Sequence, residues 1–152
     1  MVTSVVFAQG TKEWDEWYKN KEDYLINVGP SVGLALNLVT ELSDLNIQDL
    51  QQKFDEYKKN FESVLPSAEI GTIHQLNVEI MMDIKRALDT KGKGADLENY
   101  NFYREKAVKT YIEMISEMEK IFRENGAPES RLSSFSLTLE VYEKVLQDIK
   151  EE

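Results

Sequence analysis

The chain of 152 residues contains no cysteine, one histidine, three prolines and seven glycines. Without cysteine it can form no disulfide, thiolate metal site or iron–sulfur cluster and has no thiol nucleophile. No glutamate stands three residues before His74, so the Glu-x-x-His elements of a di-iron helical bundle are also missing. Because proline and glycine are few, long segments are free of helix breakers, which favours helices over the short strands of a sandwich or barrel.

Positive charge is scarce as well. The chain carries 18 lysines and arginines against 28 aspartates and glutamates, which gives a formal net charge of −10. A field of that sign disfavours approach to phosphate backbones, so we expect no nucleic acid partner. Four cations do gather at the end of one predicted helix, interspersed with aspartates: Lys85, Arg86, Lys91 and Lys93. Cations at that position offset the helix dipole and keep the following loop solvated.

Long hydrophobic runs are absent too. No stretch reaches about 18 consecutive apolar residues, so no membrane-spanning helix is predicted. Within the short apolar run from Val2 to Ala8, Val6-Phe7-Ala8 has the small residues that a signal peptidase requires before Gln9. We interpret residues 1–10 either as the remnant of a secretory signal that begins upstream of Met1 or as a frayed or disordered N-terminus. The first interpretation predicts an exported, extracytoplasmic protein and the second a cytoplasmic one.

The sequence is rich in apolar residues at helical spacing, most clearly from Leu97 to Phe122. They recur there in steps of three and four, interrupted by Arg104: Leu97, Tyr100, Ala107, Tyr111, Met114, Met118 and Ile121. A strip with that period lies along one face of an α-helix. With Asp96 as N-cap and Asn125-Gly126 at its end, this helix has about 30 residues. Other long helices are needed to cover it.

Further segments repeat the same spacing. They cover residues 11–45 with Thr11 as N-cap, 47–64 after Asn46 as N-cap, 67–90 with Ser67 as cap, and 132–149. Proline lacks the amide hydrogen and disfavours helical geometry before it, so the first helix is predicted to be broken or kinked at Gly29-Pro30. Short connections imply antiparallel neighbours. Residues 11–152 therefore predict a single all-α domain, an antiparallel up-down bundle of four to six helices.

Residues 130–138 are ambiguous within this scheme, because five of them are serine or threonine. Such residues compete for backbone hydrogen bonds, so the last helix is free to begin late. The same small hydroxyl residues also suit a close approach between two helices. Both interpretations stay open.

His74 is the one residue whose chemistry suits a cofactor. A haem between helices would use it as an axial ligand, with a methionine opposite: Met81, Met82, Met114 or Met118. A single histidine near an apolar helix face is more typical of a structural residue held by a hydrogen bond. We favour that structural interpretation and predict no cofactor.

Three polar residues interrupt the apolar strips: Asn37, Asn77 and Arg104. An unpaired polar group inside a bundle costs a few kcal/mol, so Asn37 and Arg104 are expected to have partners. We favour structural contacts, or for Arg104 an extension of its head toward solvent; a small ligand pocket around Asn37 or Arg104 is the functional alternative. Trp14 and Trp17 present a similar choice between core and binding platform, and their helical spacing favours the core.

No catalytic constellation emerges from these patterns. Lys91-Gly92-Lys93-Gly94 lacks the spaced first glycine and the hydroxyl residue of a phosphate-binding loop, and it follows a predicted helix instead of a strand. A serine hydrolase with a nucleophile elbow is not expected, because His74 is the single imidazole base. We predict no catalytic, cofactor-binding or metal-ligating residues.

These expectations describe a non-enzymatic helical-bundle protein that binds a partner protein and is exported, with the partner and the oligomeric state left open. One alternative is a cytosolic acidic regulator that engages a basic protein through its acidic faces. A second alternative is a bundle that senses a small ligand.

Overall fold

The computed structural model describes residues 12–41, 46–94 and 97–151, and these residues form helices and short connections without a strand. The elements, in chain order, are α2 (Lys12–Lys19), the π-helical segment η1 (Tyr24–Val28), α3 (Gly29–Thr40), α4 (Ile47–Phe61), the 3₁₀ turn η2 (Ala68–Ile70), α5 (Gly71–Gly92), α6 (Leu97–Glu124) and α7 (Glu129–Lys150). The predicted all-α bundle is confirmed. Residues 1–10, Thr11 and Asp96 lie outside the described residues, and so do the predictions made for them.

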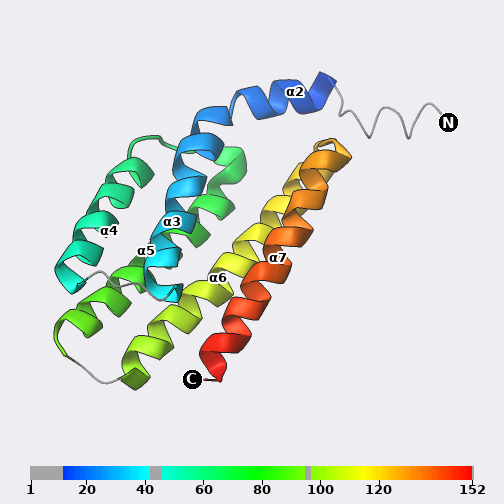
Figure 1. Cartoon of the computed structure of the whole chain (residues 1–152). Coiled ribbons are helices and arrows are strands. Elements are labelled where there is room, and N and C mark those ends of the chain that lie inside the picture. Colours follow the sequence, from blue (N-terminus) through cyan, green and yellow to red (C-terminus); the bar gives the residue numbers. More distant parts are fainter. Residues whose placement is uncertain (1–11, 42–45, 95–96, 152) are drawn as a thin grey trace.

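The five longer helices, α3 to α7, run alternately in opposite directions (Figure 1). The α5–α6 pair makes the most extensive contact. Helix α3 packs against α4, α5 and α6, while α7 packs against α6. This arrangement gives α3 neighbours on several sides, which explains its high content of apolar residues. The antiparallel up-down order predicted from the short connections is confirmed.

Helix α6 contains the strip that the sequence predicted. Ala107, Tyr111 and Met114 are buried, and Leu97 at its first turn is exposed against the prediction. The helix ends at Glu124, and Gly126 follows with a φ of 82°, the left-handed conformation that glycine adopts without strain. The amide of Ala127 donates to the carbonyl of Phe122 at 3.0 Å, and that of Gly126 donates to Arg123 at 3.2 Å. This pair of bonds is a Schellman motif, so the predicted stop at Asn125-Gly126 is confirmed.

At Gly29-Pro30, where the sequence predicts a break or kink, the chain changes from a π-helix to an α-helix. The chain is π-helical up to Val28, and the amide of Gly29 donates to the carbonyl of Tyr24, five residues earlier. Proline at position 30 has no amide hydrogen for the next helical bond, and its ring crowds the carbonyl four residues before it. The wider π turn accommodates that ring, and α3 then continues. A separate break, a turn at residues 20–21, divides α2 from this segment.

Arg104, which interrupts the α6 strip, is buried beside the end of α3. Its Nη1 donates to the carbonyl of Val39 at 3.2 Å, and its Nε donates to Asn101 Oδ1 at 2.7 Å. Tyr100 Oη donates to the same Val39 carbonyl at 3.5 Å. The last carbonyls of a helix have no partner within it, so α6 supplies donors to the end of α3. The structural interpretation of Arg104 agrees with these contacts.

The helix ends agree in part with the sequence. Asn46 caps α4, because its Oδ1 accepts a hydrogen bond from the Asp49 amide at 2.9 Å. Ser67 makes no such bond, so its predicted capping role is wrong. Helix α5 continues to Gly92, two residues beyond the predicted end. Helix α7 is helical from Glu129 onward, with hydroxyls of its first turns bonded back to their own backbone, so the late start does not occur.

The two tryptophans belong to an aromatic cluster where α2 meets the end of α6. Trp14 is buried, its ring stacks on Trp17 at 5.4 Å between centroids, and its edge meets Phe122 at 4.8 Å. Phe122 also contacts Phe135 of α7 at 5.1 Å. These contacts join three helices, and the core interpretation of Trp14 and Trp17 is therefore favoured over the binding platform.

Candidate functional site

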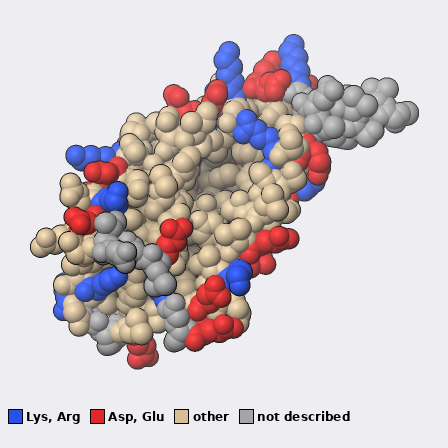
Figure 2. Space-filling model, in the orientation of Figure 1, with Lys and Arg blue, Asp and Glu red and all other residues tan. Residues whose placement is uncertain are grey.

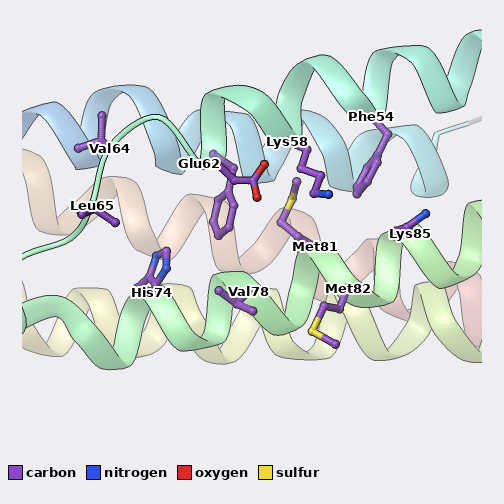
Figure 3. A pocket seen from close by; sticks show the side chains of 11 residues that line it. Phe54, Lys58, Glu62, Val64, Leu65, His74, Val78, Met81, Met82 and Lys85 are labelled. Atoms are coloured by element: carbon purple, nitrogen blue, oxygen red, sulfur yellow. The ribbon is translucent and has the colours of Figure 1, made fainter.

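An apolar groove lies between α4 and α5, and its cavity has a volume of about 490 Å³ (Figure 3). Eleven side chains line it, from both helices and from the connection after α4: Phe54, Lys58, Phe61, Glu62, Val64, Leu65, His74, Val78, Met81, Met82 and Lys85. Seven of these are aliphatic, phenyl or thioether groups. A cavity of this size and composition is typical of a binding site for a small molecule. We refer to it as the α4–α5 groove.

The groove follows from the spacing of its residues on two antiparallel helices. On α5, His74, Val78, Met81 and Lys85 recur in steps of four and three, so they lie along one face. That face spans about 16 Å at 1.5 Å per residue. On α4, residues 54, 58 and 61 follow the same rule, and residues 62, 64 and 65 continue the lining past the end of the helix.

Apolar side chains of the groove remain in contact with solvent. Leu65 is 89% exposed and Met82 is 48% exposed, although both belong to the lining. Phe54, Phe61 and Met81 are buried and form part of the core beneath them. An occupant would therefore bury apolar surface that the folded chain leaves in water, which is a favourable contribution to binding.

His74 lies in the groove and connects it to the interior. Its Nδ1 is 2.8 Å from Tyr24 Oη, and Asn77 Nδ2 donates to that same Oη at 3.3 Å. The imidazole stacks on Phe61 with 5.3 Å between centroids and 7° between planes. Burial lowers the pKa of His74 and raises the pKa of Tyr24, although the hydrogen bond from Asn77 partly opposes the latter. Both shifts favour the neutral form of the group.

The sequence interpretation of His74 as a hydrogen-bonded structural residue agrees with this network. Of the methionines considered as partners for a haem, Met81 and Met82 line the groove with it, while Met114 and Met118 belong to α6. Asn77 is fully buried and bonded to Tyr24. Its Nδ2 is therefore paired inside the core, while its Oδ1 has no hydrogen-bond partner among the described residues.

The other predicted polar candidates lie outside the groove lining. Arg104 contacts the end of α3, as described above. Asn37 accepts a hydrogen bond from Tyr142 Oη of α7 at 3.1 Å. The structure therefore gives both residues structural partners and places the groove elsewhere.

Charges at the rim of the groove come from both helices. Figure 3 shows Lys58 and Lys85 toward the end near Phe54, and His74 toward the opposite end. Lys85 pairs with Asp89 at 3.3 Å, and Arg86 pairs with the buried Asp83 at 2.9 Å. The cations that gather in the sequence are thus partly neutralised by neighbours, as predicted from the interspersed aspartates.

A smaller hollow lies where helices at the N- and C-terminal parts of the chain meet. Figure 2 shows charged residues mainly around the rim of one face and an uncharged, hollowed centre. A cavity of about 200 Å³ lies between α2, the π-helical segment, α6 and α7: its lining is Tyr18, Leu25, Met118, Phe122, Arg131, Ser134 and Phe135. Its volume is less than half that of the α4–α5 groove and its lining is less apolar, so the groove is the stronger candidate of these two cavities.

A serine motif was missed by the sequence reasoning above. Residues 29–33 read Gly-Pro-Ser-Val-Gly, which has the Gly-x-Ser-x-Gly spacing of a nucleophile elbow. An elbow places its serine on a sharp turn between a strand and a helix. Here Ser31 is buried inside α3, and its Oγ donates to the carbonyl of Asn27 at 2.9 Å. The spacing therefore occurs without the geometry that makes such a serine a nucleophile.

Metal sites and membrane-spanning helices are both absent from the part of the chain that the structure describes. Within residues 12–41, 46–94 and 97–151, no group of three or more histidine, aspartate or glutamate side chains is placed to hold a metal ion. No helix in those ranges is long and apolar enough to cross a membrane. Comparisons with protein-family models, curated protein sequences and solved structures found no match. The chemistry of the groove is therefore the basis for a functional proposal.

Proposed function

We propose that this chain is a non-enzymatic binding protein whose α4–α5 groove holds a small apolar ligand. The observation that supports the proposal is a cavity of about 490 Å³ with apolar walls and a histidine held in place at one end. Ligand sites combine mostly apolar walls with a few fixed polar groups. This is the ligand-sensing alternative of the sequence analysis.

A small ligand suits the groove better than a helix from a partner protein. The apolar face of α5 is about 16 Å long, which corresponds to about three turns of a docked helix. Lysines and a glutamate lie along that short length, so a continuous apolar stripe would meet charge at several points. A compact ligand can occupy the apolar part alone.

The proposal is tested with N-phenyl-1-naphthylamine, a neutral dye that becomes fluorescent in apolar surroundings. Met82→Glu places a carboxylate on the groove wall, where desolvation of the charge opposes the dye. Leu137→Glu is the matched control, since Leu137 is 65% exposed on α7 and outside the groove. We expect Met82→Glu to weaken dye binding about tenfold and Leu137→Glu to leave it unchanged.

Equal dye binding by both variants and the unmodified protein would contradict the proposal. So would an absence of dye binding by the unmodified protein. If an amphipathic helical peptide binds the groove and the dye does not, the partner-protein prediction from the sequence is favoured over a small ligand.

We also propose that the protein is exported, on the basis of Val6-Phe7-Ala8. N-terminal sequencing of protein recovered from an exporting host tests this: a mature chain that starts at Gln9 supports export.

The alternative, an acidic cytosolic regulator, predicts salt-sensitive binding to a basic protein, because dissolved salt screens the attraction between opposite charges.

A further inference from the structure

We infer that the His74 Nε2–H group is a hydrogen-bond donor for the ligand in the α4–α5 groove, and that the ligand is an apolar molecule with a carbonyl oxygen. This inference rests on the proposed function and specifies the ligand class. Its basis is a hydrogen-bond network of Asn77, Tyr24 and His74, which determines which ring nitrogen of His74 carries the proton.

The hydrogen-bond network begins with the side-chain amide of Asn77. Its Nδ2 donates to Tyr24 Oη at 3.3 Å, so that oxygen serves as an acceptor there. The single hydroxyl proton of Tyr24 is then available for His74 Nδ1, 2.8 Å away. An Nδ1 that accepts a hydrogen bond carries no proton of its own, and a neutral imidazole has one N–H. With Tyr24 as the donor, this arrangement assigns the proton of His74 to Nε2.

The ring that carries this proton is held on several sides. Phe61 stacks on it, and Tyr24 meets it edge to face with 5.6 Å between centroids. Tyr24 and Asn77 are themselves buried, so the support is part of the core. A donor fixed in this way loses little conformational entropy when it binds an acceptor.

The direction of Nε2 follows from that of Nδ1. Nδ1 is turned toward Tyr24 in the interior, and the same ring lines the groove (Figure 3), so we place its other nitrogen on the groove side. Among the described residues, no hydrogen-bond partner of Nε2 is present. Nε2 is not one of the buried unpaired atoms of the described residues, so water reaches it in the groove, and an acceptor on the ligand would replace that water.

A carbonyl oxygen suits this position better than a charged group. The lysines of the rim lie toward the Phe54 end, away from His74 (Figure 3). The nearest lining residues at the His74 end are apolar, including Val64 and Leu65, and Glu62 of the same lining is itself negative. A neutral acceptor therefore matches the surroundings of Nε2, and the rest of the ligand matches the apolar walls.

The first test measures the proton directly by ¹⁵N NMR of the full chain, in which His74 gives the single histidine signal set. We expect Nε2 to be protonated and Nδ1 to be unprotonated near pH 7. Tyr24→Phe removes the hydroxyl and should shift the population toward the other tautomer. A proton found on Nδ1 in the unmodified protein would overturn the inference.

The second test compares 4-phenyl-2-butanone with butylbenzene, which has the same carbon skeleton without the carbonyl. In His74→Phe, which keeps a flat ring for stacking on Phe61, we expect the ketone to bind about fivefold more weakly. Butylbenzene should bind both proteins equally. Circular dichroism establishes that the variant is folded.

The outcomes separate the two proposals. If butylbenzene binds the groove and His74→Phe does not change ketone affinity, the donor role of His74 is wrong and the groove remains a ligand site. If neither probe binds the unmodified protein, the proposed function fails and this inference fails with it.

Discussion

Tyr142 on α7 donates a hydrogen bond from its hydroxyl to Asn37 Oδ1 on α3 at 3.1 Å. The two helices lie on either side of α6, and Tyr142 also packs against Tyr111 of α6 with 4.6 Å between ring centroids. The contact explains why the sequence places a polar asparagine in its most apolar helix. It joins α7 to a helix with which it otherwise has little contact.

The first prediction concerns this bond. Tyr142→Phe removes the hydroxyl and leaves Asn37 Oδ1 without its donor, so we expect the free energy of unfolding to fall by about 1 kcal/mol. Urea denaturation measures the change. Tyr103→Phe is the control, because no hydrogen bond of the Tyr103 hydroxyl is present among the described residues, and its effect should be near zero. Equal effects of the two substitutions would contradict the role assigned to Tyr142.

A second prediction tests the donors that α6 supplies to α3. Arg104→Met keeps an apolar stem but removes the donors to Val39 and Asn101, so we expect a loss of about 2 kcal/mol in the free energy of unfolding. Arg123→Met provides the comparison, because Arg123 pairs with Glu119 on the surface of the same helix. Surface pairs contribute about 0–1 kcal/mol. If Arg104→Met and Arg123→Met had the same free energy of unfolding, the contact of Arg104 with the end of α3 would not contribute to stability.

A third prediction compares two glycines. Gly126→Ala forces a side chain into the left-handed conformation at the end of α6, and we expect it to cost about 1 kcal/mol. Gly71→Ala should instead stabilise the protein by up to about 1 kcal/mol, since Gly71 has helical φ and ψ and its added Cβ would meet no atom within 4 Å beyond its chain neighbours. Thermal melting distinguishes the signs. The same sign for both would contradict the assignment of the helix end.

The fourth prediction is a loss of stability at alkaline pH. Burial raises the pKa of Tyr24, Tyr100, Tyr111 and Tyr142 above the ordinary value of 10.0. Above that pH the unfolded chain releases protons that the folded chain retains, so the unfolded state gains stability. We expect the free energy of unfolding to fall as pH rises through 10 toward the raised pKa values. Tyrosinate absorbance that titrates identically in the folded and urea-unfolded protein would contradict this.

The helices were predictable because their signals are local. Strips such as the one from Leu97 to Phe122 need only a 3.6-residue period, and the end at Asn125-Gly126 needs only a residue suited to positive φ. The prediction for Ser67 failed because a capping residue still requires the chain to place its hydroxyl near an amide. Leu97 is exposed because periodicity does not show whether a neighbour covers a given turn.

The α4–α5 groove could not be predicted for a related reason. Val78, Met81 and Met82 fit a core strip equally well whether or not another helix covers them. Coverage depends on how α3, α4 and α5 are arranged, which is a tertiary property. The link from His74 to Tyr24 spans 50 residues, and no local pattern in the sequence indicates that pairing.

The fifth prediction tests the proposal that the α4–α5 groove binds a small apolar ligand, by ¹³C NMR of methionine methyl groups during titration with butylbenzene. Met81 and Met82 line the groove, while Met114 and Met118 on α6 serve as internal controls in the same spectrum. We predict that the Met81 and Met82 signals shift and show magnetisation transfer from the probe, with Met114 and Met118 unchanged. Shifts confined to the α6 methionines, or no shift at any of the four, would contradict the account.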